Sequence, residues 1–171
     1  MSMLIFKSTK QAVFIVIVAI TLLNTSCKKK DDTTLYQVND EELLPSNVNK
    51  KRLKTNEQYV SILYANLFQK ALSANSVYDI SQCFESIGDK VVAREVLISN
   101  FMNKPDVLIP SVTQMNADID KFVVDTYKRF YIRLPTEAEK AYIKKSITAD
   151  PNLTPELVYM SFALSDEYMY Y

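Results

Sequence analysis

The stretch from residue 122 to residue 168 decides the fold. It begins FVVDTYKRFYIRLPTEAEKAYI (122–143) and ends LTPELVYMSFALSDEY (153–168). Its apolar residues recur every three or four positions, which is the spacing of helices that bury one face. The stretch therefore predicts three amphipathic helices.

Two sites in this stretch are typical helix starts. Thr136 is followed three positions later by Glu139, the pattern of a capping box. Thr154 precedes Pro155, and proline is favoured at the first helical position. We expect the helix before them to run from Ser111 to about residue 133. The side chains expected on the three inner faces are Met115, Ile119, Phe122, Val123, Thr126, Tyr127, Phe130 and Leu134, then Ala138, Tyr142, Ile143 and Ile147, then Leu157, Met160, Phe162, Leu164 and Tyr168.

A weaker copy of this plan lies upstream. Thr55 and Gln58 form another capping-box pattern, and a helix with helical apolar spacing follows it. We expect a second helix from about Ser76 to Ile87 and a third from Lys90 to Asn103. Gly88 lies between these two helices, where a left-handed residue often ends a helix.

The two copies align. Phe122 lies 63 positions after Tyr59, and the same offset places Tyr127 over Tyr64. Later, an offset of 66 places Ser165 over Ser99. We interpret this as a duplication, the alternative being chance similarity between amphipathic helices. The predicted fold is all-α, with about six amphipathic helices as two three-helix repeats in one compact bundle, the first unit covering 55–109 and the second 110–171.

Composition narrows the function classes. The chain has 171 residues, one glycine, two cysteines and neither tryptophan nor histidine. The lack of histidine removes the commonest general base and metal ligand. The formal net charge is zero, so the chain has no global attraction to nucleic acid. We therefore expect no enzymatic activity, no catalytic residue, no cofactor, no metal and no nucleic-acid partner.

Residues 1–26 have the features of a lipoprotein signal peptide. Lys7 and Lys10 precede the apolar run AVFIVIVAITLL (12–23), which is too short to span a bilayer comfortably. A small residue, Ser26, then precedes Cys27, as in the box cut by lipoprotein signal peptidase. The predicted lipid attachment site is therefore Cys27. The alternatives are an uncleaved anchor helix, or cleavage without lipid.

A charged run, KKKDD (28–32), follows Cys27 directly. Such a run resembles the export signal that places some lipoproteins on the outer face of the outer membrane, and its alternative is a solvated spacer. Residues 27–54 are predicted to be the acylated cysteine and a flexible tether. The predicted location is the cell envelope, lipid-anchored in the outer membrane and surface-exposed.

The second unit resembles a bacterial helical domain of unknown function found in secreted and surface proteins, whose start also resembles phycobilisome linker domains. The resemblance rests on a start, a middle and a closing motif. Those residues are Phe122, Val123, Tyr127, Arg133 and Pro135, then Glu139 and Tyr142, then Ser165, Asp166, Glu167 and Tyr168. Thr126 stands where the family has leucine. The resemblance implies a helical fold and a non-cytoplasmic setting, and it brings no catalytic residue.

Charged side chains and one thiol are the remaining candidates for chemistry. The carboxylates that could pair or bind calcium are Glu137, Glu139, Glu156, Asp166 and Glu167, and most are expected to cap helices instead. Arg133 is expected to donate to helix-end carbonyls, and Asp125 to pair with Arg129. Cys83 is expected to be a small buried thiol beside Phe84.

Tyr170 and Tyr171 at the chain end are the candidate contact surface, because packing on a helical face does not explain them. The function expected is a non-catalytic outer-membrane or surface lipoprotein that acts as a protein interaction or scaffold module. Its partners would be the membrane, through lipid on Cys27, and an envelope protein. The alternative is a glycan-binding accessory lipoprotein of a polysaccharide uptake system.

Overall fold

The structure is a computed structural model that describes residues 43–46 and 48–171. All of the described residues belong to one compact part, Asp40–Tyr171. The predictions for the signal peptide, Cys27 and residues 28–32 therefore lie outside the described residues.

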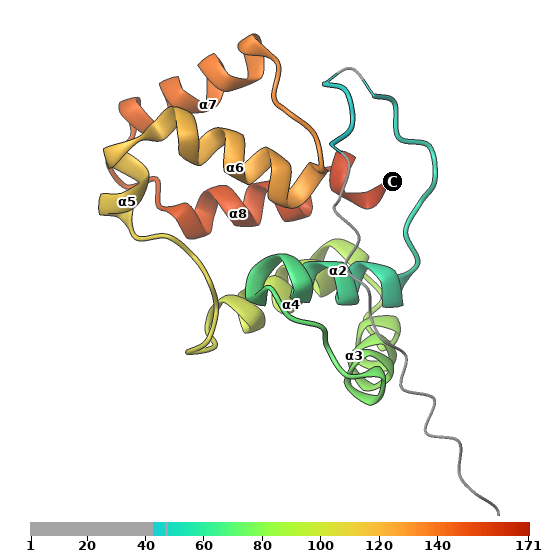
Figure 1. The fold of residues 1–171 in the computed structure, drawn as a ribbon. Coiled ribbons are helices and arrows are strands. Elements are labelled where there is room, and N and C mark those ends of the chain that lie inside the picture. The colour runs from blue at the N-terminus through green and yellow to red at the C-terminus, as the bar shows by residue number, and fades with distance from the viewer. Residues whose placement is uncertain (1–42, 47) are drawn as a thin grey trace, which may run out of the picture. The chain divides into compact units, whose positions relative to one another are not determined.

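Helices make up 66% of the described residues, which contain no strand, so the all-α fold is confirmed. Seven α-helices and one short 3-10 helix follow each other in this described part (Figure 1). They are α2 (Asn56–Phe68), α3 (Ala74–Ser86), α4 (Lys90–Met102), α5 (Val112–Ala117), α6 (Ile119–Tyr131), α7 (Glu137–Ala149), α8 (Pro155–Leu164) and η1 (Glu167–Met169). Among these residues no helix has both the length and the apolar character needed to cross a bilayer.

Capping boxes begin α2 and α7, as the sequence analysis above predicts, and a third begins α5. In each, a hydroxyl accepts from the third helical N–H and a Gln or Glu returns to the cap N–H. The residue pairs are Thr55 with Gln58, Ser111 with Gln114, and Thr136 with Glu139.

The long helix predicted from Ser111 to about residue 133 is wrong, because the chain breaks at Asp118. This residue ends α5 and begins α6, with φ −154° and ψ 85°. Its carboxylate accepts from the Lys121 N–H at 2.9 Å. A short polar side chain that binds its own backbone competes with continued helix, which explains the break.

The prediction that Gly88 is left-handed is also wrong, because this glycine does not have a positive φ. Two other residues adopt that conformation, Gln69 at φ 51° and Ile132 at φ 57°. They end α2 and α6 respectively.

The core is rich in aromatic rings, and its centre is the fully buried Tyr168 of η1. Its ring meets those of Tyr59 in α2 and Phe130 in α6 at 5.6 and 5.7 Å between centroids. The inner-face predictions fail at a few positions: Leu134, Tyr142 and Leu157 are 45%, 70% and 50% exposed, and Ala138 is exposed.

The two-repeat organisation is visible in the helix bounds. Both α2 and α6 have 13 residues, and the starts and ends of one lie 63 positions after those of the other. The same offset relates α3 to α7, including their caps Ser73 and Thr136. Even the left-handed residues, Gln69 and Ile132, differ by 63 positions.

The third pair, α4 and α8, aligns at an offset of 65 rather than the predicted 66. Their caps Asp89 and Thr154 differ by 65 positions. The same offset matches the buried residues Ala93 with Val158, Leu97 with Phe162 and Ile98 with Ala163. We refer below to α2, α3 and α4 as the first repeat and to α6, α7 and α8 as the second. The equivalent helices α4 and α8 pack against each other and join the repeats.

Residues 48–54, which we call the strap, do not behave as the flexible tether expected up to residue 54. The Lys54 N–H donates to the Met169 carbonyl, and the Arg52 carbonyl accepts from the Tyr171 N–H, both at 2.9 Å. Just before the strap, the Leu44 N–H donates to the Ile132 carbonyl at 2.8 Å. The end of the predicted tether is therefore paired with the C-terminal segment and with the end of α6.

Candidate functional site

Arg133 is the centre of the most concentrated charge cluster in the described residues. It follows the left-handed turn at Ile132, and its side chain is only 5% exposed. Its guanidinium donates to Glu139 at 2.7 and 3.0 Å and to Glu167 twice at 2.7 Å. The remaining donor reaches the Leu134 carbonyl at 3.1 Å.

All five N–H groups of this guanidinium are therefore used. The prediction that Arg133 donates to helix-end carbonyls is wrong, because Leu134 lies beyond the end of α6 in the loop before α7. Two carboxylates take the other four bonds. These carboxylates favour the charged guanidinium and raise the pKa of Arg133. In return, the hydrogen bonds from Arg133 lower the pKa of Glu139 to about 2. This arrangement locks α6, α7 and η1 together and leaves no guanidinium donor for a ligand.

The strap adds two largely buried lysines beside this cluster. Lys50 is 6% exposed, donates to the Tyr131 carbonyl at 2.7 Å and lies 3.4 Å from Glu167. Burial lowers its pKa. Lys54 donates to the Tyr168 carbonyl and lies 4.0 Å from the centre of the Tyr168 ring.

Lys54 has no salt bridge to a carboxylate within the described part of the chain. Burial and the nearby charge of Lys50 lower its pKa to about 8. Sequence reasoning missed these lysines because the strap has no apolar periodicity. The one sequence signal that could have indicated them was the high number of Lys and Arg residues in the strap.

Two of the acids that were considered for a catalytic pair or a calcium site have capping and pairing partners. Glu139 belongs to a capping box, and Glu137 pairs with Lys140 on the same helix. The described residues contain no group of three or more side chains placed to hold a metal ion. The predicted pair of Asp125 with Arg129 is wrong: Asp125 pairs with Lys121, while Arg129 donates to the Leu108 carbonyl.

The terminal tyrosines lie against the strap. Tyr170 and Leu53 form an isolated antiparallel β-bridge through their backbones. The centre of the Tyr171 ring lies 5.8 Å from the Arg52 guanidinium. Their exposed fractions are 37% and 39%, so part of each ring remains open to solvent. Neither ring stacks on another ring in the described chain.

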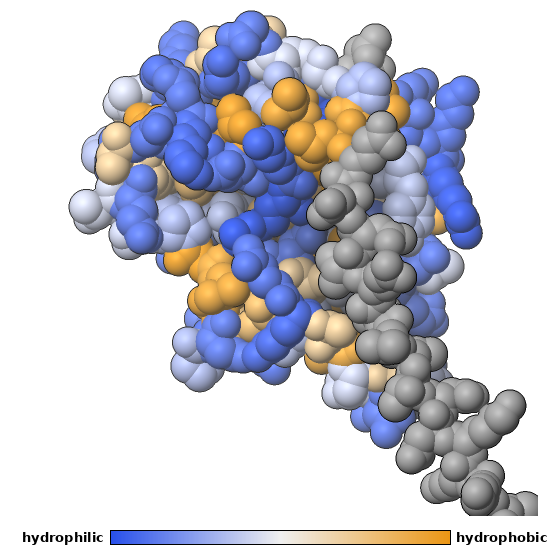
Figure 2. Space-filling view, viewed as in Figure 1, coloured by the Kyte–Doolittle hydropathy of each residue, from blue (hydrophilic) through white to orange (hydrophobic). Residues whose placement is uncertain are grey.

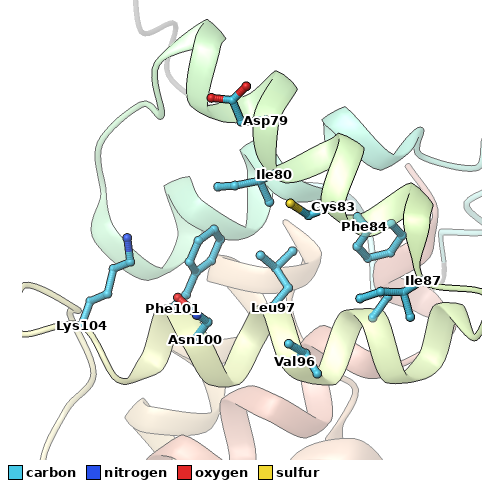
Figure 3. Close-up of a pocket in the computed structure, with 11 residues that line it drawn as sticks. Asp79, Ile80, Cys83, Phe84, Ile87, Val96, Leu97, Asn100, Phe101 and Lys104 are labelled. Atoms are coloured by element: carbon cyan, nitrogen blue, oxygen red, sulfur yellow. The ribbon is translucent and has the colours of Figure 1, made fainter.

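A second feature is an apolar groove between α3 and α4, with a volume of about 360 Å³ (Figure 3). Its walls are mainly the apolar side chains Ile80, Phe84, Ile87, Ala93, Val96, Leu97 and Phe101. Cys83 also lines it and is exposed, so the prediction of a buried thiol is wrong. Cys83 lies one position before the buried Phe84, which turns its side chain toward the open face of α3.

The outer face of α4 continues this apolar surface. Val91, Val92 and Val96 are 54%, 45% and 54% exposed. Figure 2 shows another face of the molecule, where apolar side chains form separate patches among hydrophilic ones. The sequence predicts that these three valines lie on a helix. It does not predict that they point outward, because that depends on which face of α4 packs against α8.

No protein-family model, no curated protein and no solved structure matches this chain.

Proposed function

We propose that this chain is a non-catalytic envelope lipoprotein. Residues 1–26 would direct export, Cys27 would carry the lipid, and the anchor would lie in the outer membrane with the body exposed at the cell surface. The helical body would act as an interaction or scaffold module that holds an envelope protein near the membrane.

The observation that carries the interaction role is the difference between two equivalent surfaces. The exposed Val91 and Val96 of the first repeat correspond, at the offset of 65, to Glu156 and Ser161 of the second. The fold therefore accepts polar residues at these two positions, while the third valine, Val92, corresponds to the exposed Leu157. Exposed apolar side chains that the fold does not need are typical of a binding surface.

The charge clusters fit the same proposal. The strongest one, around Arg133, is saturated by internal hydrogen bonds that connect three elements. The strap bonds to the C-terminal segment and to the end of α6, and none of its backbone hydrogen bonds reaches α3 or α4.

A photo-crosslinking residue at Val92 tests the interaction role in intact cells. We expect one adduct with an envelope protein from position 92 and none from a control at Thr148, an exposed position on α7. The adduct should disappear when Val91 and Val96 are replaced by Glu and Ser, their counterparts in the second repeat. Equal crosslinking from both positions, or no adduct from either, would contradict the proposal.

Lipidation needs its own test. Radioactive palmitate should label the full chain but not its Cys27→Ser variant, and Cys83→Ser should leave labelling unchanged. Protease added to intact cells should digest the body if it faces outward. The glycan-binding alternative depends on the exposed tyrosines, and it stays a prediction.

A further inference from the structure

The groove between α3 and α4 is polar at one end and apolar at the other. Figure 3 shows Asp79 and Lys104 toward one end, and Phe84 and Ile87 toward the other. Neither Asp79 nor Lys104 forms a salt bridge with another described residue. One free carboxylate and one free ammonium thus stand at the same end of an apolar trough.

The apolar part has the dimensions of a single short chain. On α3 it extends from Ile80 to Ile87, which is about 10 Å at the rise of an α-helix. Its volume of about 360 Å³ falls at the small end of ligand pockets. Beside Val96, α4 also presents the polar residues Glu95, Ser99 and Asn103. This is much less apolar area than a standard protein interface requires.

The second repeat supplies an internal comparison for this groove. The positions equivalent to Cys83, Ile87 and Val96 carry Ser146, Asp150 and Ser161. Every one of these changes is from an apolar or weakly polar side chain to a polar one. Other lining residues stay apolar in both repeats, since Ile80, Phe84 and Leu97 correspond to Ile143, Ile147 and Phe162. Packing of the fold therefore explains that part of the groove, but it does not explain the apolar or weakly polar side chains of Cys83, Ile87 and Val96.

We propose that this groove binds a single-chain amphiphile with a zwitterionic head group. Its alkyl chain covers Ile80, Cys83, Ile87 and Val96. The anionic group of the head, a phosphate or a carboxylate, pairs with Lys104, and its amine pairs with Asp79. Opposite charges at the two mouth residues favour a head group that carries both signs over one that carries a single sign. This site lies beside the valine face proposed above for the protein partner and shares Val96 with it.

Cys83 provides a direct readout of occupancy. The chain has two cysteines, so a protein that begins at residue 28 contains the whole compact part and keeps Cys83 as its single thiol. We expect lauroyl-lysophosphatidylethanolamine, kept below the concentration at which it forms micelles, to slow alkylation of Cys83 by iodoacetamide in a saturable way. Neutral dodecyl maltoside should protect far less at the same concentration.

Matched variants test the contacts of the alkyl chain and those of the head group separately. Val96→Ser, which installs the residue of the second repeat, should weaken protection about tenfold because it removes buried apolar contact. Lys104→Gln should weaken protection by laurate and leave protection by dodecylamine unchanged. Asp79→Asn should weaken protection by dodecylamine and leave protection by laurate unchanged. The substitution Ser161→Ala on α8 is the control and should leave protection unchanged. Circular dichroism should show the same helix content in every variant.

Four outcomes would overturn the proposal. They are no protection at all, equal protection by every head group, protection only by intact phospholipid vesicles, and protection only when an envelope protein is added. The third would indicate docking on a membrane surface and the fourth a protein segment in the groove. The photo-crosslinking result at Val92 does not depend on any of these, so the two proposals can fail separately.

Discussion

Arg133 joins parts of the chain that are far apart in sequence, because its two carboxylate partners are Glu139 and Glu167, the second 34 positions away. We expect Arg133→Met to destabilise the fold by about 3 kcal/mol, since two partly buried carboxylates would lose their shared partner. Urea denaturation measures this change. Lys144→Met removes an exposed pair with Asp120 and should cost less than about 1 kcal/mol. Similar losses in the two variants would show that the cluster around Arg133 contributes no special stability.

The same cluster predicts a loss of stability in acid. The folded pKa of Glu139 is about 2, below its value of 4.5 in an unfolded chain. A lowered carboxylate pKa contributes stability that is present above about pH 4.5 and is lost as the pH falls toward 2. The slope of unfolding free energy against pH in this window should be smaller in Glu139→Gln than in the parent. An unchanged slope would mean that Arg133 does not hold Glu139 ionised.

Lys54 predicts a second rise of stability with pH, this time in the alkaline range. Its folded pKa is about 8 and its unfolded value is 10.5, so the unfolded chain binds more protons between these values. Stability should therefore rise as the pH increases from about 8 to 10.5. Lys54→Met should raise stability near neutral pH by about 1 kcal/mol and reduce this rise. Lys51→Met, at an exposed position of the same strap, is the control and should retain the rise.

At the scale of the helices, two ends carry backbone strain that a single substitution can relieve. Gln69 has φ 51° at the end of α2, and its side chain is exposed. A left-handed residue with a Cβ costs about 1 kcal/mol more than glycine. We expect Gln69→Gly to stabilise the protein by about 1 kcal/mol in thermal or urea unfolding. Ala65→Gly, at an exposed position inside the same helix, should destabilise by a similar amount. A loss of stability in Gln69→Gly would contradict the assignment of strain.

Helix starts could be predicted because their signals are local. The hydroxyl of Thr136 and the carboxylate of Glu139 lie three positions apart in the chain as they do in the cap. The break at Asp118 was missed because its cap lies within a continuous apolar pattern, and the pattern alone does not show which interaction prevails. The left-handed turn at Ile132 was missed because β-branched residues rarely adopt that conformation.

Features that depend on distant contacts could not be predicted in the same way. The exposed Tyr142 and the buried Arg133 reverse the usual preference of their side chains. Both follow from how α6, α7 and η1 meet, which the sequence pattern of one helix does not contain. The repeat itself was detectable, because the offset of 63 holds for the sequence and for the bounds of α2, α3, α6 and α7.

At the scale of the whole described part, the two repeats share one hydrophobic core. The equivalent helices α4 and α8 pack on each other, with Ile98 and Ala163 fully buried. Helix α2 also donates two hydrogen bonds to the second half of the chain: Tyr59 donates to the Ala163 carbonyl of α8 at 3.2 Å, and Asn66 donates to the Tyr168 hydroxyl of η1 at 3.0 Å. A repeat taken alone would expose the apolar face of its third helix, and such units usually need their neighbour for stability.

This sharing predicts that the repeats fold as one unit and complement each other when separated. A protease site inserted between Lys104 and Pro105, where the chain is exposed, cuts the connection without touching α4 or α8. We expect the two pieces to elute together after cleavage and to keep their helix content, because the α4–α8 contact holds them. Each piece purified alone in urea and then diluted should lack most of its helix signal, and mixing should restore it. Two fragments that each fold separately would show instead that a three-helix repeat is a sufficient folding unit, and that the interface between α4 and α8 is not needed to form either core.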